Sequence, residues 1–135
     1  MLQDAGGGRY LDIGCGEGWA LDAASVSGIG FAVGIDTDEA ALKKIVNKSR
    51  NIILASALQV PFKQQTFDVV SAWDVTGHLL EGEKFKGVSE ISCVVKSGGR
   101  YLVSVPFSNL LSNALDPPWW IGHRHYTKCD IYKMT

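Results

Sequence analysis

The sequence predicts a single α/β domain built around a doubly wound, mostly parallel sheet. Short apolar segments alternate with amphipathic helical segments along the chain, an order typical of β-α-β units. The first apolar segment, residues 9–15, runs directly into three alternating glycines and then into a predicted helix. A length of 135 residues is enough for one hydrophobic core. We therefore interpret residues 1–135 as one domain.

Each predicted element rests on a local pattern. The strands are nearly continuous apolar runs, as expected where both faces of a parallel sheet are buried. The helices carry apolar residues three and four positions apart, and in the last one this face consists of Phe85, Val88, Ile91 and Val95. Lys96-Ser97-Gly98-Gly99 is expected to end that helix. Strands are expected at residues 9–15, 31–35, 52–55 and 100–105, and residues 67–79 are expected to contain a further strand and its exit loop. Helices are expected at residues 17–27, from 38 onward, and at 83–96.

Gly14, Gly16 and Gly18 follow the first strand and form the motif around which the chain is organised. Without a Cβ, such residues let the backbone bend sharply and let a ligand approach it closely. The helix start that follows favours a carboxylate or phosphate group. A dinucleotide-binding turn would need a further glycine where Trp19 stands, which argues against NAD. Cys15 is interpreted as a small structural residue, with a reactive thiol at a helix start as the alternative.

An acidic residue ends the second predicted strand. Asp36 lies 22 residues after Gly14. At this place in a nucleotide-binding sheet, an acidic side chain accepts hydrogen bonds from ribose hydroxyls. The alternative role, capping the next helix, can be filled by Asp38 instead. Asp36 and its neighbour Thr37 are therefore candidate cofactor-binding residues.

These motifs resemble those of the class I S-adenosylmethionine-dependent methyltransferases, in particular the small-molecule enzymes of the methyltransferase-11 and methyltransferase-12 type. The first motif of that family is an acidic residue, here Asp12, followed by Gly-x-Gly-x-Gly. Residues 56–62 resemble the family's Gly-Asp-Ala-x-x-Leu-Pro-Phe stretch, with Ser56 in place of the aspartate. Residues 67–79 resemble its Phe-Asp-x-Val segment, in which Gly77 replaces a glutamate before His78.

The resemblance implies a cofactor site for S-adenosylmethionine, with S-adenosylhomocysteine as its product. In such a site the first motif lines the methionine part, Asp36 holds the ribose with Thr37 beside it, and residues 56–58 close over the adenine. Trp73, at the end of the fourth strand, is expected to pack on the cofactor, and a histidine is expected to remove the acceptor's proton. The alternative role is a loop hydrogen bond for His78 and a surface position for His123 and His125. The implied cofactor-binding residues are Asp12, Gly14, Cys15, Gly16, Gly18, Asp36, Thr37, Ser56, Ala57, Leu58 and Trp73, and the candidate bases are His78, His123 and His125.

The family fold implies a Rossmann-like sheet with strand order 3-2-1-4-5, followed by a sixth and a seventh strand. The chain stops before those two strands, so we expect a C-terminally truncated domain. Loss of both strands would leave the fifth strand with an exposed edge, which is a template for pairing with another chain. A homo-oligomer through that edge, or a fragment of limited stability, is the expected consequence.

Composition narrows the classes of partner. A formal net charge of −1 gives no field that would attract nucleic acid or an anionic membrane. No apolar run is long enough to span a membrane, and residues 1–9 lack a signal sequence, so a cytoplasmic location is expected. The cysteines Cys15, Cys93 and Cys129 have neither disulfide nor zinc-ligand spacing, and no metal is expected.

The sequence therefore predicts an enzyme that transfers a methyl group to an oxygen, nitrogen or carbon nucleophile of a small molecule. The first alternative is a non-catalytic methyltransferase-like subunit that binds the cofactor or only a partner chain. The second alternative is a nicotinamide-dependent oxidoreductase, which the position of Trp19 disfavours.

Overall fold

The computed structural model describes residues 7–46, 51–73, 75 and 79–104. The predicted order of elements is confirmed within these residues, and most boundaries shift only slightly. The elements are β1 (Arg9–Ile13), α1 (Trp19–Val26), β2 (Phe31–Asp36), α2 (Glu39–Val46), β3 (Asn51–Leu54), β4 (Phe67–Trp73), the 3-10 helix η3 (Glu81–Glu83), α3 (Lys84–Val94) and β5 (Val95–Ser104). None of the described helices is long and apolar enough to cross a membrane.

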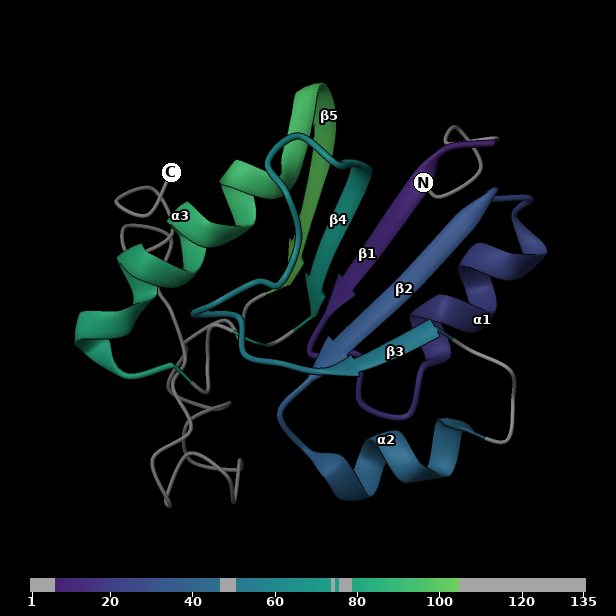
Figure 1. Cartoon of the computed structure of the whole chain (residues 1–135), viewed down its shortest axis with the longest axis horizontal. Helices are drawn as coiled ribbons and strands as arrows, with labels where there is room; N and C mark the ends of the chain where they lie inside the picture. Colours follow the sequence, from purple (N-terminus) through teal and green to yellow (C-terminus); the bar gives the residue numbers. More distant parts are fainter. Residues whose placement is uncertain (1–6, 47–50, 74, 76–78, 105–135) are drawn as a thin grey trace, which may run out of the picture.

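The described strands form one sheet in the order β3-β2-β1-β4-β5, and every neighbouring pair is parallel (Figure 1). The predicted doubly wound fold and its strand order are therefore confirmed. Parallel strands end at the same edge of a sheet, so the residues that follow β1, β2, β3 and β4 are brought to one side of the molecule. The predicted absence of two further strands concerns residues beyond 104, which lie outside the described residues.

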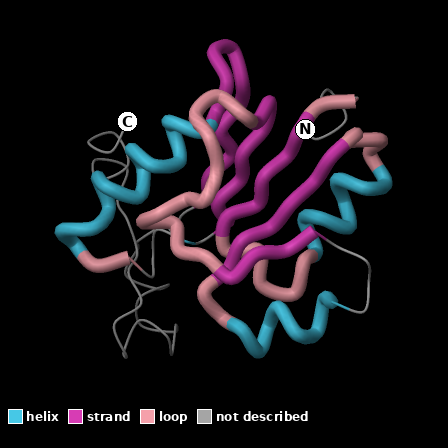
Figure 2. Tube along the Cα trace, viewed as in Figure 1, coloured by secondary structure: helices cyan, strands magenta, loops and turns pink. Residues whose placement is uncertain are grey.

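Helices cover both faces of the sheet (Figure 2). On one face Leu11, Ile13 and Ile35 pack with Ile91 and Val94 of α3. On the opposite face Tyr10 and Val69 belong to a second apolar cluster, which also contains the inner residues of α1 and α2. The inner residues of α1 and α2 are all buried: Ala20, Leu21, Ala24, Leu42 and Ile45. Burial on both faces explains the continuous apolar runs of the strands.

The predicted apolar face of the last helix is wrong in part. Phe85 is 72% exposed, whereas Ile91 is buried as expected. The buried face consists of Lys84, Gly87, Ile91 and Val94. Val95 already has an extended backbone and pairs with Phe67 of β4, so it cannot belong to the helical stripe. The helix therefore ends one residue before Val95, and its stripe is rotated by about one position.

Strand β5 also begins earlier than predicted. Val95 pairs with Phe67 and Arg100 pairs with Val69, so residues 96–99 lie opposite Asp68 alone. The predicted Lys96-Ser97-Gly98-Gly99 turn is thus a bulge inside β5 rather than a connection before it. A Cβ on Gly99 would lie 3.0 Å from the Asp68 carbonyl oxygen and 2.9 Å from the Lys96 carbonyl oxygen. These two carbonyl oxygens leave no room for a side chain at position 99, which explains the glycine.

Candidate cofactor-binding site

The glycine turn after β1 crosses over the end of β2. Gly14 and Cys15 both donate their backbone N–H groups to the carbonyl oxygen of Ile35, at 2.8 and 3.0 Å. Gly14, Gly16 and Gly18 have φ angles of 70°, 50° and 83°, all in the left-handed region. A side chain would strain the backbone at each of these positions. The turn predicted from the glycine spacing is thus formed by glycines in a conformation that other residues rarely adopt.

Asp36 joins this turn to the start of α2. Its Oδ2 accepts a hydrogen bond from Gly16 N at 2.7 Å, and its Oδ1 accepts one from Asp38 N at 2.8 Å. Asp38 in turn accepts hydrogen bonds from the N–H groups of Ala40 and Ala41, which confirms its predicted capping role. Each carboxylate oxygen of Asp36 accepts one hydrogen bond from a backbone amide and keeps a further lone pair. Asp36 is therefore available to accept hydrogen bonds from a ligand carrying two hydroxyls.

A pocket of about 140 Å³ opens beside Asp36 at the carboxyl edge of the sheet. Five of the predicted cofactor residues line it: Gly14, Asp36, Thr37, Ser56 and Ala57. Four further lining residues were missed: Ile13, Ala55, Val75 and Leu79. The first two adjoin predicted residues in the sequence, and the last two are apolar residues in the segment that follows β4. A carboxylate among apolar walls suits a ligand with a hydroxylated sugar and a flat apolar base.

The turn after β3 is held by the serine that replaces the family's aspartate. Ser56 Oγ accepts a hydrogen bond from Leu58 N at 3.1 Å, and its carbonyl accepts one from Gln59 N. The Leu58 amide is therefore already bonded, and Leu58 does not line the pocket. Ser56 and Ala57 are the residues of this turn that face the pocket. The Ser56 hydroxyl keeps its proton and one lone pair for a ligand.

Cys15 lies in the core rather than at the surface of the turn. The residue is 2% exposed, and its Sγ would be 2.7 Å from a Cβ placed on Gly34. Burial, followed by the charges of Asp12 and Asp36, raises the pKa of the thiol to about 12. A thiol that stays protonated is a poor nucleophile. The structural interpretation of Cys15 is thus favoured over a reactive thiol, and its contribution to the turn is its backbone.

Asp12 belongs to a buried polar chain on the face of the sheet opposite Leu11 and Ile13. Ser71 Oγ donates to Asp12 Oδ1 at 2.5 Å and lies 2.6 Å from Tyr10 Oη. Because a serine hydroxyl has one proton, Tyr10 must be the donor to Ser71. Burial raises the pKa of Asp12 to about 6, against the lowering effect of the bonds from Ser71 and Tyr10. Asp12 is therefore a buried residue that links β1 to β4 through Ser71, and it does not line the pocket beside Asp36.

Trp73 lies on that same opposite face. The centroid of its ring is 5.4 Å from that of the Trp19 ring, and the two ring planes form an angle of 47°. Trp73 packs against the cluster that contains Tyr10 and is absent from the lining of the pocket beside Asp36. The structure thus does not bring Trp73 together with Ser56 and Ala57, which line that pocket. The candidate bases His78, His123 and His125 lie outside the described residues.

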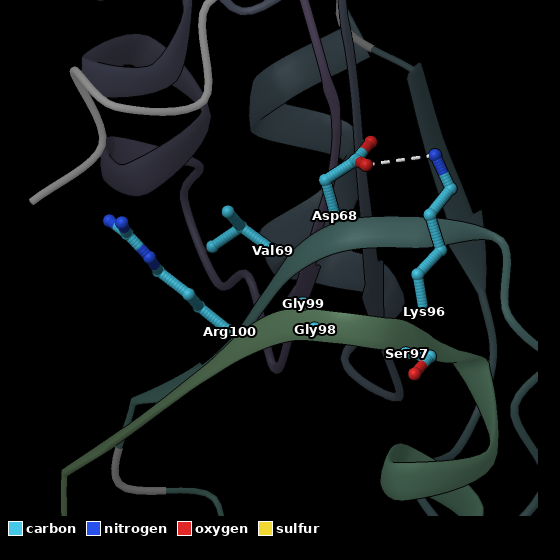
Figure 3. Close-up of a pocket in the computed structure, with 7 residues that line it drawn as sticks. All are labelled: Asp68, Val69, Lys96, Ser97, Gly98, Gly99 and Arg100. Atoms are coloured by element: carbon cyan, nitrogen blue, oxygen red, sulfur yellow. Dashed lines mark hydrogen bonds and ion pairs between the residues drawn. The ribbon is translucent and has the colours of Figure 1, made fainter.

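A second pocket, of about 240 Å³, lies at the other end of the strands (Figure 3). Lys96 Nζ contacts Asp68 Oδ1 at 2.8 Å, while Arg100 extends away from Lys96. Asp68 Oδ2 accepts a hydrogen bond from the backbone N–H of Arg9 at 2.8 Å. The Lys96 and Arg9 contacts hold the pKa of Asp68 below its usual value. None of the predicted cofactor residues lines this pocket.

The fold and the glycine turn define a class I methyltransferase-like protein, and comparison with known families agrees. Residues 11–103 match the family model described as a methyltransferase domain. The chain belongs to this family.

Two curated relatives and one solved structure illustrate the relationship. The chain is 32% identical over 119 residues to the demethylmenaquinone methyltransferase of Symbiobacterium thermophilum, covering 78% of this chain and 46% of the relative. It is 30% identical over 100 residues to an Arabidopsis thaliana tRNA (carboxymethyluridine(34)-5-O)-methyltransferase, covering 73% of this chain and 24% of the relative. The YcgJ protein of Bacillus subtilis has the same fold, with a TM-score of 0.77 at 21% identity, over 99% of this chain and 63% of its own. The chain thus spans less than half the length of either curated relative.

Proposed function

We propose that this chain binds S-adenosylmethionine at the carboxyl edge of its sheet and transfers the methyl group to a nucleophile of a small molecule. The observation that carries the proposal is the Asp36 carboxylate, which bridges the glycine turn and the start of α2 at the mouth of an apolar pocket. Such a carboxylate beside a glycine turn is the arrangement that binds the ribose of nucleotide cofactors. The domain, residues 1–135, would then be the cofactor-binding part of a methyltransferase.

The described residues fit this cofactor. Asp36 accepts hydrogen bonds from the ribose hydroxyls, with Thr37 beside it at the pocket. Ser56 and Ala57 face the edge of the base, while Ile13 and Val75 supply apolar walls. The Gly14 to Gly18 turn allows the methionine part to approach the backbone closely, because no Cβ stands in the way. When bound, the cofactor supplies an activated methyl group on its sulfonium sulfur.

The remaining work of the protein is to position the acceptor and to take up its proton. We propose His78, His123 or His125 for proton removal, since an imidazole titrates near neutral pH. A pH profile of methyl transfer for each His→Gln variant would identify the base: the variant that loses the limb near the imidazole pKa carries that role. A set of three unchanged profiles would exclude these histidines.

For the acceptor, we favour a small molecule over a nucleic acid. One relative acts on demethylmenaquinone and another on a tRNA, so the family permits both classes. Proteins that bind nucleic acid do so largely through contacts of lysine and arginine with phosphates, and this chain has 13 basic against 14 acidic residues.

We also propose that β5, the last strand in the described sheet, pairs with a second copy of the chain in the cytoplasm. Light scattering across a concentration series measures that association.

Calorimetric titration with S-adenosylhomocysteine tests the cofactor proposal. We expect binding to the wild type and a Kd at least about tenfold higher for Asp36→Asn, because the charged acceptor is lost while the shape is kept. Asp68→Asn is the matched control, since it removes a half-exposed carboxylate from the opposite end of the sheet. NAD serves as the control ligand. A folded wild-type protein that binds neither ligand would favour the non-catalytic partner-binding alternative.

A further inference from the structure

Two apolar side chains that line the pocket beside Asp36, those of Val75 and Leu79, each lie close against a glycine. A Cβ on Gly14 would lie 2.5 Å from Val75 Cγ2, and a Cβ on Gly87 would lie 2.9 Å from Leu79 Cδ1. Contacts this short are essentially never made by a real Cβ. Val75 and Leu79 therefore occupy the space that side chains at positions 14 and 87 would take. The wall of the pocket between β1 and α3 depends on both glycines.

Gly87 has no backbone reason to be glycine. It lies inside α3 and is buried, and a glycine in a helix interior is less favourable than an alanine. Its φ angle is not in the left-handed region, unlike that of Gly14. The close approach of Leu79 is the feature of its surroundings that a Cβ would disturb most, because the next contact, Leu58 Cδ2, is at 3.8 Å.

The segment that carries Leu79 is held against the start of α3. Leu80 N donates a hydrogen bond to Glu83 Oε2 at 3.1 Å, and Glu83 N donates one to the Leu80 carbonyl at 2.9 Å. These two bonds close the turn that precedes the helix, so the backbone beside Leu79 has little freedom to retreat. A methyl group at position 87 would displace chiefly the Leu79 side chain, which also lines the pocket beside Asp36.

We propose that Gly87 is a positioning residue that sets the width of the pocket, and that Leu79, seated on it, is the wall against which the flat base of the ligand lies. The inference rests on the proposed function, because it takes the ligand to be an adenine nucleoside such as S-adenosylhomocysteine. Ile13, Ala57 and Val75 complete an apolar lining of the kind that suits a purine ring. Gly87 acts on the ligand only through Leu79.

The test is a set of four proteins titrated with S-adenosylhomocysteine: wild type, Gly87→Ala, Leu79→Ala and the double variant. We expect Gly87→Ala to raise the Kd about tenfold, because the displaced Leu79 side chain narrows the pocket. Its Tm should change little, since the higher helix propensity of alanine offsets the cost of moving one flexible side chain. In the Leu79→Ala background, Gly87→Ala should leave the Kd unaltered, because the displaced side chain is gone. Gly82→Ala is the matched control, since a Cβ there meets nothing within 4 Å.

Two results would overturn the inference. One is a Gly87→Ala protein of normal stability that binds S-adenosylhomocysteine as the wild type does. The other is an equal loss of affinity from Gly87→Ala with and without Leu79. If Gly87→Ala folds poorly, Leu79→Ala alone decides, because truncating a wall must weaken binding and an unchanged Kd contradicts the assignment. A wild type that fails to bind at all refutes the proposed function instead.

Discussion

The two ends of the sheet each carry a glycine with almost the same φ angle, yet only one of them has a side chain packed closely against it. Gly14, at the carboxyl end, has φ 70°, and Gly98, in the bulge of β5, has φ 76°. A Cβ on Gly14 would meet Val75 Cγ2 at 2.5 Å, whereas a Cβ on Gly98 would meet nothing within 4 Å. The same residue type therefore serves backbone geometry alone at one end, and backbone geometry together with a closely packed pocket wall at the other.

The pockets at the two ends differ in the same way. The larger one, about 240 Å³, is lined by residues of β4 and β5 around a partly exposed ion pair. The smaller one, about 140 Å³, collects residues that follow four strands, β1 to β4, and contains Asp36. Volume alone would favour the amino-terminal end of the sheet. The convergence of several strand ends on one polar group is the better guide to a binding site.

The largest expected effect comes from Gly14→Ala measured beside Gly98→Ala. Both changes place a side chain in the left-handed region, which costs about 1–2 kcal/mol. Gly14→Ala also overpacks Val75, which adds about 1–3 kcal/mol and should abolish binding of S-adenosylhomocysteine. Urea unfolding and calorimetry measure the two effects. Equal losses in the free energy of unfolding of the two variants would show that the packing around Gly14 does not contribute to stability.

A smaller effect, specific to pH, is expected from Asp12. Burial raises the pKa of its carboxyl from the ordinary value of 3.8 to about 6 in the folded state, so the folded protein favours the protonated form. Stability should therefore fall as the pH rises from about 4 to about 7, by up to about 3 kcal/mol, and then level off. Urea unfolding across this range measures the slope. Asp12→Asn should remove this slope, since an amide does not titrate. A variant with the same slope as the wild type would assign the effect to another group.

The smallest effect is expected at the amino-terminal end. The side chains of Asp68 and Lys96 are 38% and 40% exposed, so breaking their ion pair with Lys96→Met should cost less than about 1 kcal/mol. Because the pKa of Asp68 is lowered, its contribution is present above the unfolded-state value and is lost as the pH falls through the folded-state value. Urea unfolding at pH 7 with and without 1 M salt measures it. Any change in the affinity for S-adenosylhomocysteine would contradict the separation of the two ends.

Local patterns predicted well wherever a single segment determined the structure. The alternation of strands and helices, the glycine turn and the Asp38 cap all depend on residues close together in the chain. The errors arose where distant segments meet. The stripe through Phe85 was placed about one position too far along the helix, because the pairing of Val95 with Phe67 sets where α3 ends. Trp73 remains a predicted cofactor residue, and the structure adds only that its ring packs with that of Trp19 on the face away from the pocket beside Asp36.

The sequence by itself determined the class of fold, the family and the acidic residue at the end of β2, because periodicity, glycine spacing and strand ends are properties of short segments. Only the tertiary structure decided which side chains enclose the pocket. Leu79 is close to Gly87 in the chain, but its position at the pocket also depends on where β4 ends and how α3 packs on the sheet. Val75 and Gly14 are 61 residues apart, and their contact exists only because β1 and β4 are neighbouring strands. The walls of a site are set by distances between elements, and those distances are fixed by packing.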